Sequence, residues 1–451
     1  MSSYEIAIAR IFALGHELAQ TPSHKFDLAH MRVLLAGLDN PERRFPSVLI
    51  AGTNGKGSTA STLASILQAS GLRTGLYTSP HLVRINERIR IGGEQIGDDD
   101  FALVHDLVDR TAERLVGEGD LPWHPSFFEM LTAIAFEHFA RRKVDIAVLE
   151  VGMGGRLDAT NVVEPCVSVI TDISLDHQKF LGDTVTEIAG EKAGIIRAAG
   201  VVVTLPQQPQ ANEVVGNRIL ELGARAVNAV PYVPPVSPAS SEYLSTHAGE
   251  TPVSRYPLQV MGKQILVETP LLGRHQLRNV ALAIAAAEEL ARQGCPVTPA
   301  TMERGIRGTH WPGRFQVLPA AGNGAPEYVF DVAHNPAGAW ALRSTLSAGY
   351  PDRPLTFVFG AMRDKAIGEM AEILFPLAER VIVTRADNPR SASPEEIRKA
   401  AARTSTPLEE AADVAAAIRL AKTSVRPDTV VVITGSIYIV GEAMRLLGAR
   451  I

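Results

Sequence analysis

Residues 47–59 read Ser-Val-Leu-Ile-Ala-Gly-Thr-Asn-Gly-Lys-Gly-Ser-Thr, and this stretch carries most of the information about the fold. The apolar run at 48–51 is typical of a short buried strand, and apolar residues recur at helical spacing from Ala60 to Leu67. The glycines between them allow a tight turn whose backbone N–H groups can point at an anion. A strand, a glycine-rich loop and a helix N-terminus in this order hold nucleotide phosphates. The sequence therefore predicts a site for ATP or a close relative.

Polar side chains in this loop suit phosphate and magnesium. Lys56 supplies a positive charge, and Ser58 and Thr59 carry hydroxyls that can bind Mg²⁺. The spacing departs from the usual G-x-x-x-x-G-K-[ST] pattern, because Gly57 stands between the lysine and the first hydroxyl. The alternative is a glycine-rich turn without a ligand. A lysine between two glycines at a helix start favours the anion site, because its charge needs a partner there.

The composition is that of an ordinary globular protein. The chain has 451 residues, enough for two or three domains, with 46% hydrophobic and 21% charged residues. A net charge of −5 argues against broad binding to nucleic acids or anionic membranes. Two cysteines, Cys166 and Cys295, cannot form a disulfide framework, and neither a signal sequence nor a membrane-spanning apolar run is evident. We therefore expect a soluble cytoplasmic protein without nucleic-acid or membrane partners.

Strand-like and helix-like segments alternate through most of the chain, which predicts parallel sheets covered by helices on both faces. The clearest helices are expected at residues 127–139 and 279–292. Strands are expected at residues 48–51, 74–78, 144–149, 167–170, 201–204, 328–330, 355–359, 381–383 and 430–433.

Prolines interrupt this alternation between residues 205 and 257. We expect an irregular or β-rich excursion there, and not a third α/β unit. The fold class is therefore predicted to be α/β with two domains. An N-terminal P-loop ATPase-like domain with a parallel sheet would cover residues 1–308, and a smaller Rossmann-like α/β domain would cover residues 309–451. Ligands are expected in the cleft between them.

Several polar residues follow predicted strands, where ligands bind in open parallel sheets. Ser79, Glu150 and His177 each come at or shortly after such a strand end. Hard oxygen ligands and one imidazole near a phosphate loop suit Mg²⁺. Each residue also has a simpler explanation: Ser79 precedes a proline and could form a turn, Glu150 could be a solvated charge, and His177 could be a core histidine.

The second half of the chain offers further candidates. Asp331 and His334 follow a predicted strand and would face the cleft, while Pro336 suits a first helical turn. Arg314 lies at the expected hinge, where a guanidinium could reach phosphates or form an interdomain salt bridge. Spacing alone assigns no special role to Lys192, which would by default be an exposed helix charge.

Seven motifs occur along nearly the whole chain. They are Ala-Gly-Thr-Asn-Gly-Lys-Gly-Ser at 51–58, Thr-Ser-Pro-His at 78–81, Leu-Glu-Val-Gly-Met-Gly-Gly-Arg-Leu-Asp-Ala-Thr-Asn at 149–161, Ser-Leu-Asp-His at 174–177, Glu-Lys-Ala-Gly at 191–194, Gly-Arg-His-Gln-Leu-Arg-Asn at 273–279 and Asp-Val-Ala-His-Asn-Pro at 331–336. In this order they resemble the folylpolyglutamate synthase/dihydrofolate synthase family of ATP-dependent Mur ligases. The glycine that follows Lys56 is a feature of that family.

The resemblance implies a Mur ligase architecture and roles for individual residues. Lys56, Lys192 and His334 would be catalytic, with His334 near the reacting phosphate and Lys192 carbamylated. ATP would be bound by Asn54, Gly55, Lys56, Gly57, Ser58, Asn279, Arg314 and Asp331. Two Mg²⁺ ions would be bound by Ser58, Ser79, Glu150, His177 and Lys192. The dihydropteroate site would contain Lys25, Phe26, Asp27, Ser126, Phe127, Phe128, Leu157, Asp158 and Ala159.

The implied activity is a ligase reaction. ATP would drive the joining of L-glutamate to dihydropteroate, to the γ-carboxylate of folates, or to both, through an acyl phosphate. One alternative is a Mur-type ligase acting on a UDP-linked sugar peptide, against which the motifs at 51–58 and 331–336 argue. The other is a nucleotide-binding protein without catalysis, which the intact set of Lys56 and candidate metal ligands disfavours. The resemblance also suggests a monomer acting on small molecules.

Overall fold

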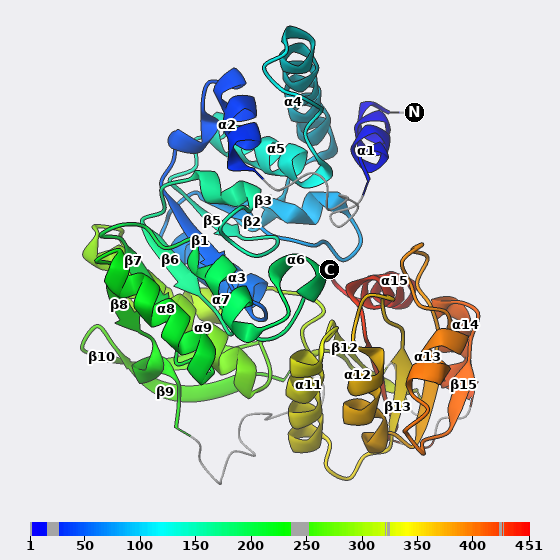
Figure 1. The fold of residues 1–451 in the computed structure, drawn as a ribbon. Coiled ribbons are helices and arrows are strands. Elements are labelled where there is room, and N and C mark those ends of the chain that lie inside the picture. The colour runs from blue at the N-terminus through cyan, green and yellow to red at the C-terminus, as the bar shows by residue number, and fades with distance from the viewer. Residues whose placement is uncertain are drawn as a thin grey trace.

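The computed structural model describes residues 2–15, 27–235, 252–320, 322, 325–423, 426 and 428–451. Two sheets dominate these residues, one of eight strands and one of six, and a two-stranded hairpin is separate from both. Figure 1 shows the larger sheet with its helices in blue to green and the smaller sheet in yellow to red. The expected α/β class, with an N-terminal parallel-sheet unit and a smaller C-terminal α/β unit, is confirmed. The boundary between residues 308 and 309 stays a prediction.

The larger sheet has the strand order β4-β3-β2-β5-β1-β6-β7-β8. Its neighbours from β2 to β8 pair in parallel, whereas β3 and β4 extend one edge in antiparallel pairing. The strands are β1 (Ser47–Ala51), β2 (Thr74–Tyr77), β3 (Ile89–Ile91), β4 (Glu94–Gln95), β5 (Ile146–Glu150), β6 (Val167–Ile170), β7 (Val201–Thr204) and β8 (Arg225–Asn228). The carboxyl ends of β1, β2, β5 and β6 therefore lie at one edge of the sheet, where they can share a ligand.

Helices cover both faces of this sheet, and residues of β1 alternate between the two cores. Leu49 and Ala51 pack with one set of helices, and Val48 and Ile50 pack with the other set and the hairpin. The first set is α1 (Ser3–Ala13), α2 (Leu28–Gly37), α4 (Asp98–Glu118), α5 (Phe127–Arg141), α7 (Val185–Ala193) and α8 (Pro209–Glu221). The second is α3 (Lys56–Ala69), α9 (Arg274–Arg292) and α10 (Pro299–Arg307). Burial on both faces is the reason why the strand at 48–51 is continuously apolar.

The expectation of an excursion at 205–257 is wrong for its first half. Helix α8 follows β7, and β8 then pairs in parallel with β7, so this segment adds another α/β unit to the sheet. Pro209 occupies the first turn of α8, where its missing N–H costs no hydrogen bond. Further on, β9 (Ser254–Val260) and β10 (Lys263–Thr269) form the antiparallel hairpin, which fits the β-rich expectation for the end of the segment.

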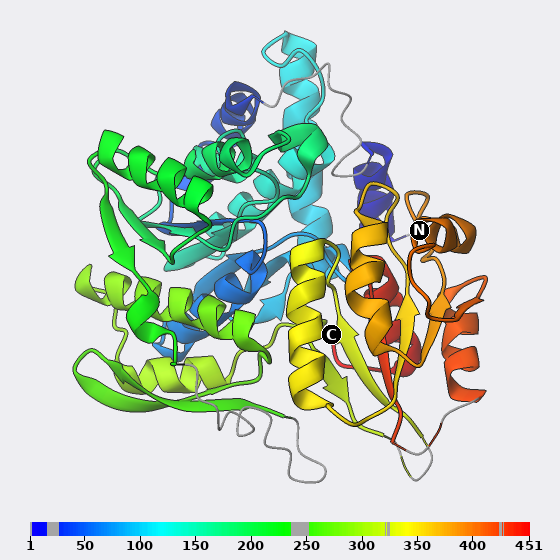
Figure 2. The same cartoon turned by 60° about the horizontal axis from the view of Figure 1, so that its bottom comes forward.

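The smaller sheet has the order β11-β12-β16-β13-β14-β15, with only β11 antiparallel to its neighbour. Its strands are β11 (Gln316–Leu318), β12 (Glu327–Asp331), β13 (Leu355–Phe359), β14 (Arg380–Val383), β15 (Leu408–Glu410) and β16 (Val430–Thr434). One face is covered by α11 (Pro336–Gly349), α12 (Ile367–Leu374) and α13 (Pro394–Ala400). The other is covered by α14 (Val414–Thr423) and α15 (Ile437–Leu447). Helix α11 contacts α9, where the two halves of the molecule meet (Figure 2).

The element boundaries agree closely with the expected strands. All nine predicted strands are present, and β5 extends one residue further than expected, to Glu150. Helix α9 begins at Arg274, five residues before the predicted start at Asn279, so Asn279 lies inside the helix. Within the described part of the chain, none of the helices combines the length and the apolar character that a membrane crossing requires.

Candidate active site

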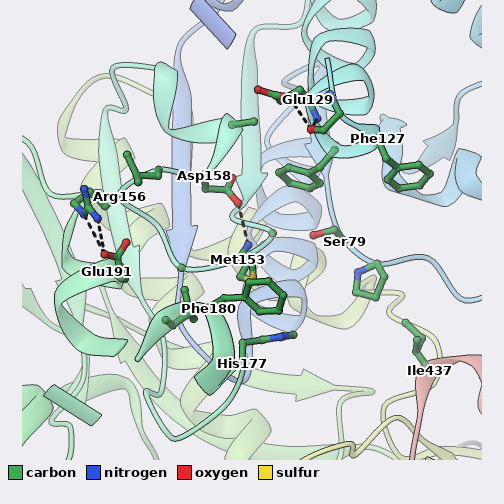
Figure 3. Close-up of a pocket in the computed structure, with 18 of the residues that line it drawn as sticks. Ser79, Phe127, Glu129, Met153, Arg156, Asp158, His177, Phe180, Glu191 and Ile437 are labelled. Atoms are coloured by element: carbon green, nitrogen blue, oxygen red, sulfur yellow. Dashed lines mark hydrogen bonds and ion pairs between the residues drawn. The ribbon is translucent and has the colours of Figure 1, made fainter. Parts of the chain in front are cut away.

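A cavity of about 310 Å³ lies between the two halves of the molecule. It is lined by α2, α5 and the loops after β2, β5 and β6 on one side, and by loops of the smaller sheet on the other. Figure 3 shows Phe127, Asp158 and His177 around this space, with Ile437 approaching from α15. Of the residues singled out in the sequence, the lining contains Asp27, Ser79, Ser126, Phe127, Phe128, Leu157, Asp158, Ala159, His177, Arg314 and His334.

The glycine-rich loop next to this cavity brings two lysines together. The Lys56 ammonium donates to the carbonyls of Gly52 and Thr53 at 3.1 and 3.2 Å. The Lys192 ammonium donates to the same Gly52 carbonyl at 2.8 Å. Spacing alone predicts an exposed helix charge at Lys192, but the residue is buried. Both ammonium groups therefore lie at the phosphate loop, and an anion there would relieve their mutual repulsion.

The surroundings of Lys192 favour its neutral form. Burial, followed by the charge of Lys56, lowers the pKa of Lys192 to about 7. A neutral amine is a nucleophile, whereas an ammonium group is not, so this position suits covalent modification of the nitrogen.

Close packing at the loop explains two of its glycines. Gly55 has a φ of 89°, and a Cβ there would lie 2.1 Å from Oδ1 of Asn279. A Cβ on Gly57 would lie 2.5 Å from the ring of Trp311. Any side chain at these positions would push the loop away from α9 or from Trp311. The predicted ATP-binding residues Gly55 and Asn279 thus lie in direct contact, and the neighbouring Ser58 is buried in the first turn of α3.

Three predicted magnesium ligands lie at or after the ends of β2, β5 and β6, on the same edge of the larger sheet. Glu150 is buried and accepts a hydrogen bond from the backbone N–H of Ser79 at 3.2 Å. His177 follows β6 and lines the cavity together with Ser79. Burial lowers the pKa of His177 to about 3, so its imidazole is neutral and has a lone pair available to a metal.

These donors fit a magnesium ion that is bound mainly by phosphate. Nowhere in the described ranges do three or more His, Cys, Asp or Glu side chains form a cluster that could hold a metal by itself. Mg²⁺ in nucleotide sites usually takes one or two protein carboxylates and completes its shell with phosphate oxygens and water. The buried carboxylate of Glu150, which lies next to the backbone of Ser79, is the kind of donor that such an arrangement uses.

Asp331 and Arg314 lie together on the side of the smaller sheet. Asp331 accepts hydrogen bonds from the backbone N–H groups of Phe315 and Ala333, both at 2.9 Å. Burial raises the pKa of Asp331 to about 6, against the opposing effects of these N–H groups and of Arg314. The Arg314 guanidinium lies 5.5 Å from the centre of the Trp311 ring. A buried carboxylate beside a cation suits recognition of hydroxyl groups and phosphate in one ligand.

Asp176 joins the two halves of the molecule. Its carboxylate accepts a hydrogen bond from Lys365 at 2.6 Å and from Asn335 at 3.1 Å, and His334 lies 3.5 Å away. Burial would raise the pKa of Asp176, but the hydrogen bond from His334 and the surrounding positive charges lower it far below its ordinary value. Asn335 also donates to Oδ1 of Asn54 in the phosphate loop at 3.0 Å. Sequence reasoning did not single out Lys365, because no motif marks it.

The part of the cavity wall that α5 contributes is aromatic. Phe127 and Phe128 of α5 line it, next to the loop at 152–159. Asp158 is buried there and accepts from the backbone N–H groups of Met153 at 2.9 Å and Thr160 at 3.0 Å, so its carboxylate shapes this loop. Burial raises the pKa of Asp158.

The remaining predicted substrate residues differ in what the structure says of them. Asp27 caps α2 by accepting from the N–H of Ala29 at 2.8 Å, and Ser126 caps α5. Lys25 and Phe26 lie outside the described residues. Asp27 and Ser126 both line the cavity, although their side chains also stabilise helix starts.

A histidine and a tryptophan that sequence reasoning missed complete this wall. His30 lies 3.0 Å from Oε1 of Glu129, and its ring stacks on Trp123 with 5.5 Å between ring centres. Burial opposes protonation of His30, but the hydrogen bond and charge of Glu129 outweigh it and raise its pKa. Both residues line the cavity. Single residues at irregular spacing carry no sequence signal that could have revealed them.

Comparison with known proteins identifies the class first. A model of the Mur ligase middle domain matches residues 126–287, and a model described as the Mur ligase, glutamate ligase domain matches residues 313–437. The folylpolyglutamate synthase of Lacticaseibacillus casei is 35% identical over 443 residues, with 96% of each chain covered. The dihydrofolate synthase/folylpolyglutamate synthase of Bacillus subtilis is 32% identical, covering 93% of this chain and 94% of the relative.

Solved structures agree with this class. Folylpolyglutamate synthase of Mycobacterium tuberculosis, complexed with ADP and AMPPCP, matches with a TM-score of 0.86 and 33% identity, covering 98% of this chain and 99% of the other. A structure described as an FPGS-AMPPCP-folate complex matches with a TM-score of 0.81 and 32% identity, covering 98% and 99%. The fold is that of a Mur ligase. Within that class, the chain belongs to the folylpolyglutamate synthase/dihydrofolate synthase family of ATP-dependent glutamate ligases.

Proposed function

We propose that the protein uses ATP to form an amide bond between L-glutamate and a carboxylate of dihydropteroate, of a folate, or of both. The observation that carries this proposal is the cavity between the two sheets. Phe127 and Phe128 form part of its wall, and it also contains His334, whose neighbour Asn335 donates a hydrogen bond to Asn54 of the loop at 52–58. A flat aromatic acid lying against Phe127 and Phe128 would direct its carboxylate toward Lys56 and the loop. Membership of the family supports the same reaction.

The ATP phosphates are proposed to lie on the loop at 52–58, against its backbone N–H groups and the ammonium of Lys56. Asn279 and Arg314 would contact the nucleotide, and Asp331 would accept from its hydroxyl groups. Two Mg²⁺ ions are proposed beside the phosphates, held by Glu150 and by the other candidate ligands Ser58, Ser79, His177 and Lys192. When bound, these ions neutralise phosphate charge and polarise the γ-phosphate.

The reaction proceeds in two steps. First, the acceptor carboxylate attacks the γ-phosphorus, the bond to ADP breaks, and an acyl phosphate forms. Then the amino group of glutamate attacks the acyl carbon, phosphate leaves, and the amine loses a proton. Because two anions meet in the first step, Lys56 and the loop N–H groups must neutralise charge in the transition state. His334 lies beside Asp176 and at the cavity, where it can contact the transferred phosphate.

Glutamate is proposed to enter from the side of the smaller sheet. Lys365 and Arg390 line this part of the cavity and bring positive charge toward the two carboxylates of glutamate. Each cation is paired with an aspartate, at 2.6 Å for Lys365 with Asp176 and 2.9 Å for Arg390 with Asp364. The paired aspartates hold the cations in place while a carboxylate substrate approaches.

Lys192 is proposed to carry a carboxylate group when the enzyme is active. A neutral lysine nitrogen reacts with carbon dioxide to form a carbamate, with loss of one proton. The lowered pKa of Lys192, about 7 through burial and the charge of Lys56, makes its nitrogen available for this step. The resulting carboxylate would provide an oxygen ligand for Mg²⁺.

The test is ATP-dependent incorporation of labelled glutamate. Dihydropteroate, tetrahydrofolate and a UDP-linked sugar peptide are offered separately, with phosphate release measured in parallel. Glutamate incorporation on either pteroyl compound supports the proposal and assigns the acceptor. Incorporation only on the sugar peptide, or ATP binding without amide formation, contradicts it. The protein is further proposed to act as a cytoplasmic monomer on these small molecules, which size-exclusion chromatography with light scattering can check.

A further inference from the structure

Trp123 is a cavity residue whose side chain is only partly covered. It lies between α4 and α5, is 47% exposed and lines the cavity. Its ring stacks on His30 at an interplanar angle of 25°, and its backbone carbonyl lies 3.0 Å from Nε2 of His30. A large apolar ring held by a neighbour and open to a cavity can stack on an aromatic ligand.

The loop that carries Trp123 is fastened to α4 through the next residue. Nε2 of His124 lies 3.3 Å from Oδ1 of Asp109, and Nδ1 of His124 lies 3.0 Å from the carbonyl of Pro125. Asp109 is 6% exposed, and its other oxygen accepts from Nη1 of Arg10 at 2.5 Å. One carboxylate on a 21-residue helix therefore holds both α1 and the loop of Trp123.

Helix α1, which Arg10 joins to Asp109, also contributes to the cavity wall near Trp123. Helix α1 places Phe12 against Phe127, with 5.8 Å between ring centres, and the residue after that helix, Leu14, lines the cavity. Loss of the Asp109 contacts would free the loop at Trp123 and the end of α1 together. Asp109 lies in α4 and Trp123 just before α5, whereas the phosphate loop lies between β1 and α3, so nucleotide binding should be insensitive to both residues.

We propose that Trp123 is a stacking platform for the flat ring system of the pteroyl substrate, and that Asp109 is the positioning residue that holds it through His124. The inference rests on the proposed function and deepens it, because it assigns the ring end of the acceptor to a specific wall. It predicts that changes at either residue affect the pteroyl substrate selectively, with little effect on ATP.

The first experiment measures steady-state kinetics of Trp123→Ala and Trp123→Phe with dihydropteroate as the varied substrate. We expect the KM for dihydropteroate to rise about tenfold in Trp123→Ala and less in Trp123→Phe, because the phenyl ring retains part of the stacking. The KM for ATP should stay unchanged. An equal rise in both KM values, or no rise for dihydropteroate, overturns the platform.

A binding measurement separates this inference from the proposed reaction. Addition of dihydropteroate should quench tryptophan fluorescence, and Trp123→Phe should lose most of that quenching. Trp340→Phe is the matched control, because Trp340 is exposed on α11 and stacks on Arg343 away from the cavity lining. If wild type quenches but does not ligate, the proposed function fails while the platform stands. If Trp123→Phe quenches as strongly as wild type, the platform fails.

The positioning role of Asp109 is tested with the variant Asp109→Asn, and Asp106→Asn on the same helix is the control. Asp106 accepts a hydrogen bond from Arg110 on the exposed side of α4. The Asp106→Asn variant should therefore change neither the KM for dihydropteroate nor the KM for ATP. We expect Asp109→Asn to raise the KM for dihydropteroate about threefold without a matching fall in kcat, and Asp109→Glu to restore part of it. In a Trp123→Ala background, Asp109→Asn should have a smaller effect than in wild type, because only the contact of Asp109 with Arg10 of α1 is then left to lose. An undiminished effect in that background shows that Asp109 acts elsewhere and overturns the positioning role.

Discussion

Lys56 is the residue on which the proposed phosphate site depends most. Its ammonium is held by two loop carbonyls, and no described carboxylate lies within salt-bridge distance of it. In the proposed first step it faces the γ-phosphate as a second anion approaches. Replacing Lys56 by Ala should lower kcat by at least about 100-fold, the size expected when a preorganised charge is removed from a phosphoryl-transfer site. Glutamate incorporation measures this effect.

A matched control for that variant is Lys263→Ala, which removes an exposed lysine from the hairpin far along the sequence. It should retain full activity. Circular dichroism and thermal unfolding should show that Lys56→Ala keeps the native fold. Near-normal turnover of Lys56→Ala would exclude the loop as the site of phosphoryl transfer.

The raised pKa of Asp331 predicts how the free energy of unfolding depends on pH. Burial raises its pKa from 3.8 to about 6, so the folded protein binds this proton more tightly than the unfolded chain does. The protonated Asp331 carboxyl stabilises the fold in full at pH values below its pKa in the unfolded chain. This stabilisation is lost as the pH rises through the pKa of Asp331 in the folded protein. Between about pH 4 and pH 6, the free energy of unfolding of wild type should fall by up to about 3 kcal/mol relative to Asp331→Asn.

Urea unfolding of both proteins at several pH values in this range, without nucleotide, measures the difference. Other titrating groups are common to both proteins and cancel. A stability difference that is constant across the range would show that the Asp331 carboxyl does not titrate there.

At the scale of elements, sequence patterns predicted strands that are buried on both faces and missed strands that are short, polar or exposed on one face. The runs at 48–51 and 430–433 are buried on both faces, so their apolar character is continuous and visible. Strand β8 lies at a sheet edge with exposed side chains, and it has no such run. Pro209 was interpreted as a breaker, yet proline is compatible with the first turn of a helix.

The same distinction applies to the site. Glycine spacing and strand ends correctly placed the loop after β1 and Glu150 at the end of β5, because local sequence determines those features, whereas their roles in binding stay predictions. Trp123, His30 and Lys365 reach the cavity only through tertiary packing, so their local sequence contains no signal for them. The position of Lys192 against Gly52 likewise depends on how α7 packs beside β1.

Substitutions at two glycines within helices test how closely neighbouring helices pack. A Cβ on Gly305 of α10 would lie 2.4 Å from the Cα of Ile66 in α3, whereas a Cβ on Gly216 of α8 meets nothing within 4 Å. Gly305→Ala should therefore destabilise the protein by about 1–3 kcal/mol through overpacking. Gly216→Ala should stabilise it by about 0.5–1 kcal/mol, because alanine is the better helix former. Chemical unfolding measures both. Equal effects of the two variants would contradict the close contact of α10 with α3.

At the scale of the whole molecule, Asp176 and Lys365 connect the two sheets beside the cavity. The proposed phosphate loop belongs to the larger sheet, and Asp331 and His334 belong to the smaller one, so the proposed reaction needs the two sheets in a fixed relation. Asn335 adds a second connection, to Asn54. Apolar packing joins the halves as well, because Leu82 and Leu272 are buried in the two cores of the smaller sheet.

Lys365→Ala should affect turnover more than nucleotide binding. The variant leaves the buried, charged Asp176 without its closest cation, which weakens the connection between the halves, and a misplacement of about 1 Å can cost about 100-fold in rate. We expect kcat to fall at least tenfold, about 1.4 kcal/mol of transition-state stabilisation, while the Kd of an ATP analogue changes by less than about threefold. Lys422→Ala, an exposed lysine on α14, should leave both quantities unchanged. A loss confined to nucleotide binding would mean that Lys365 serves the phosphate site directly and not the arrangement of the two sheets.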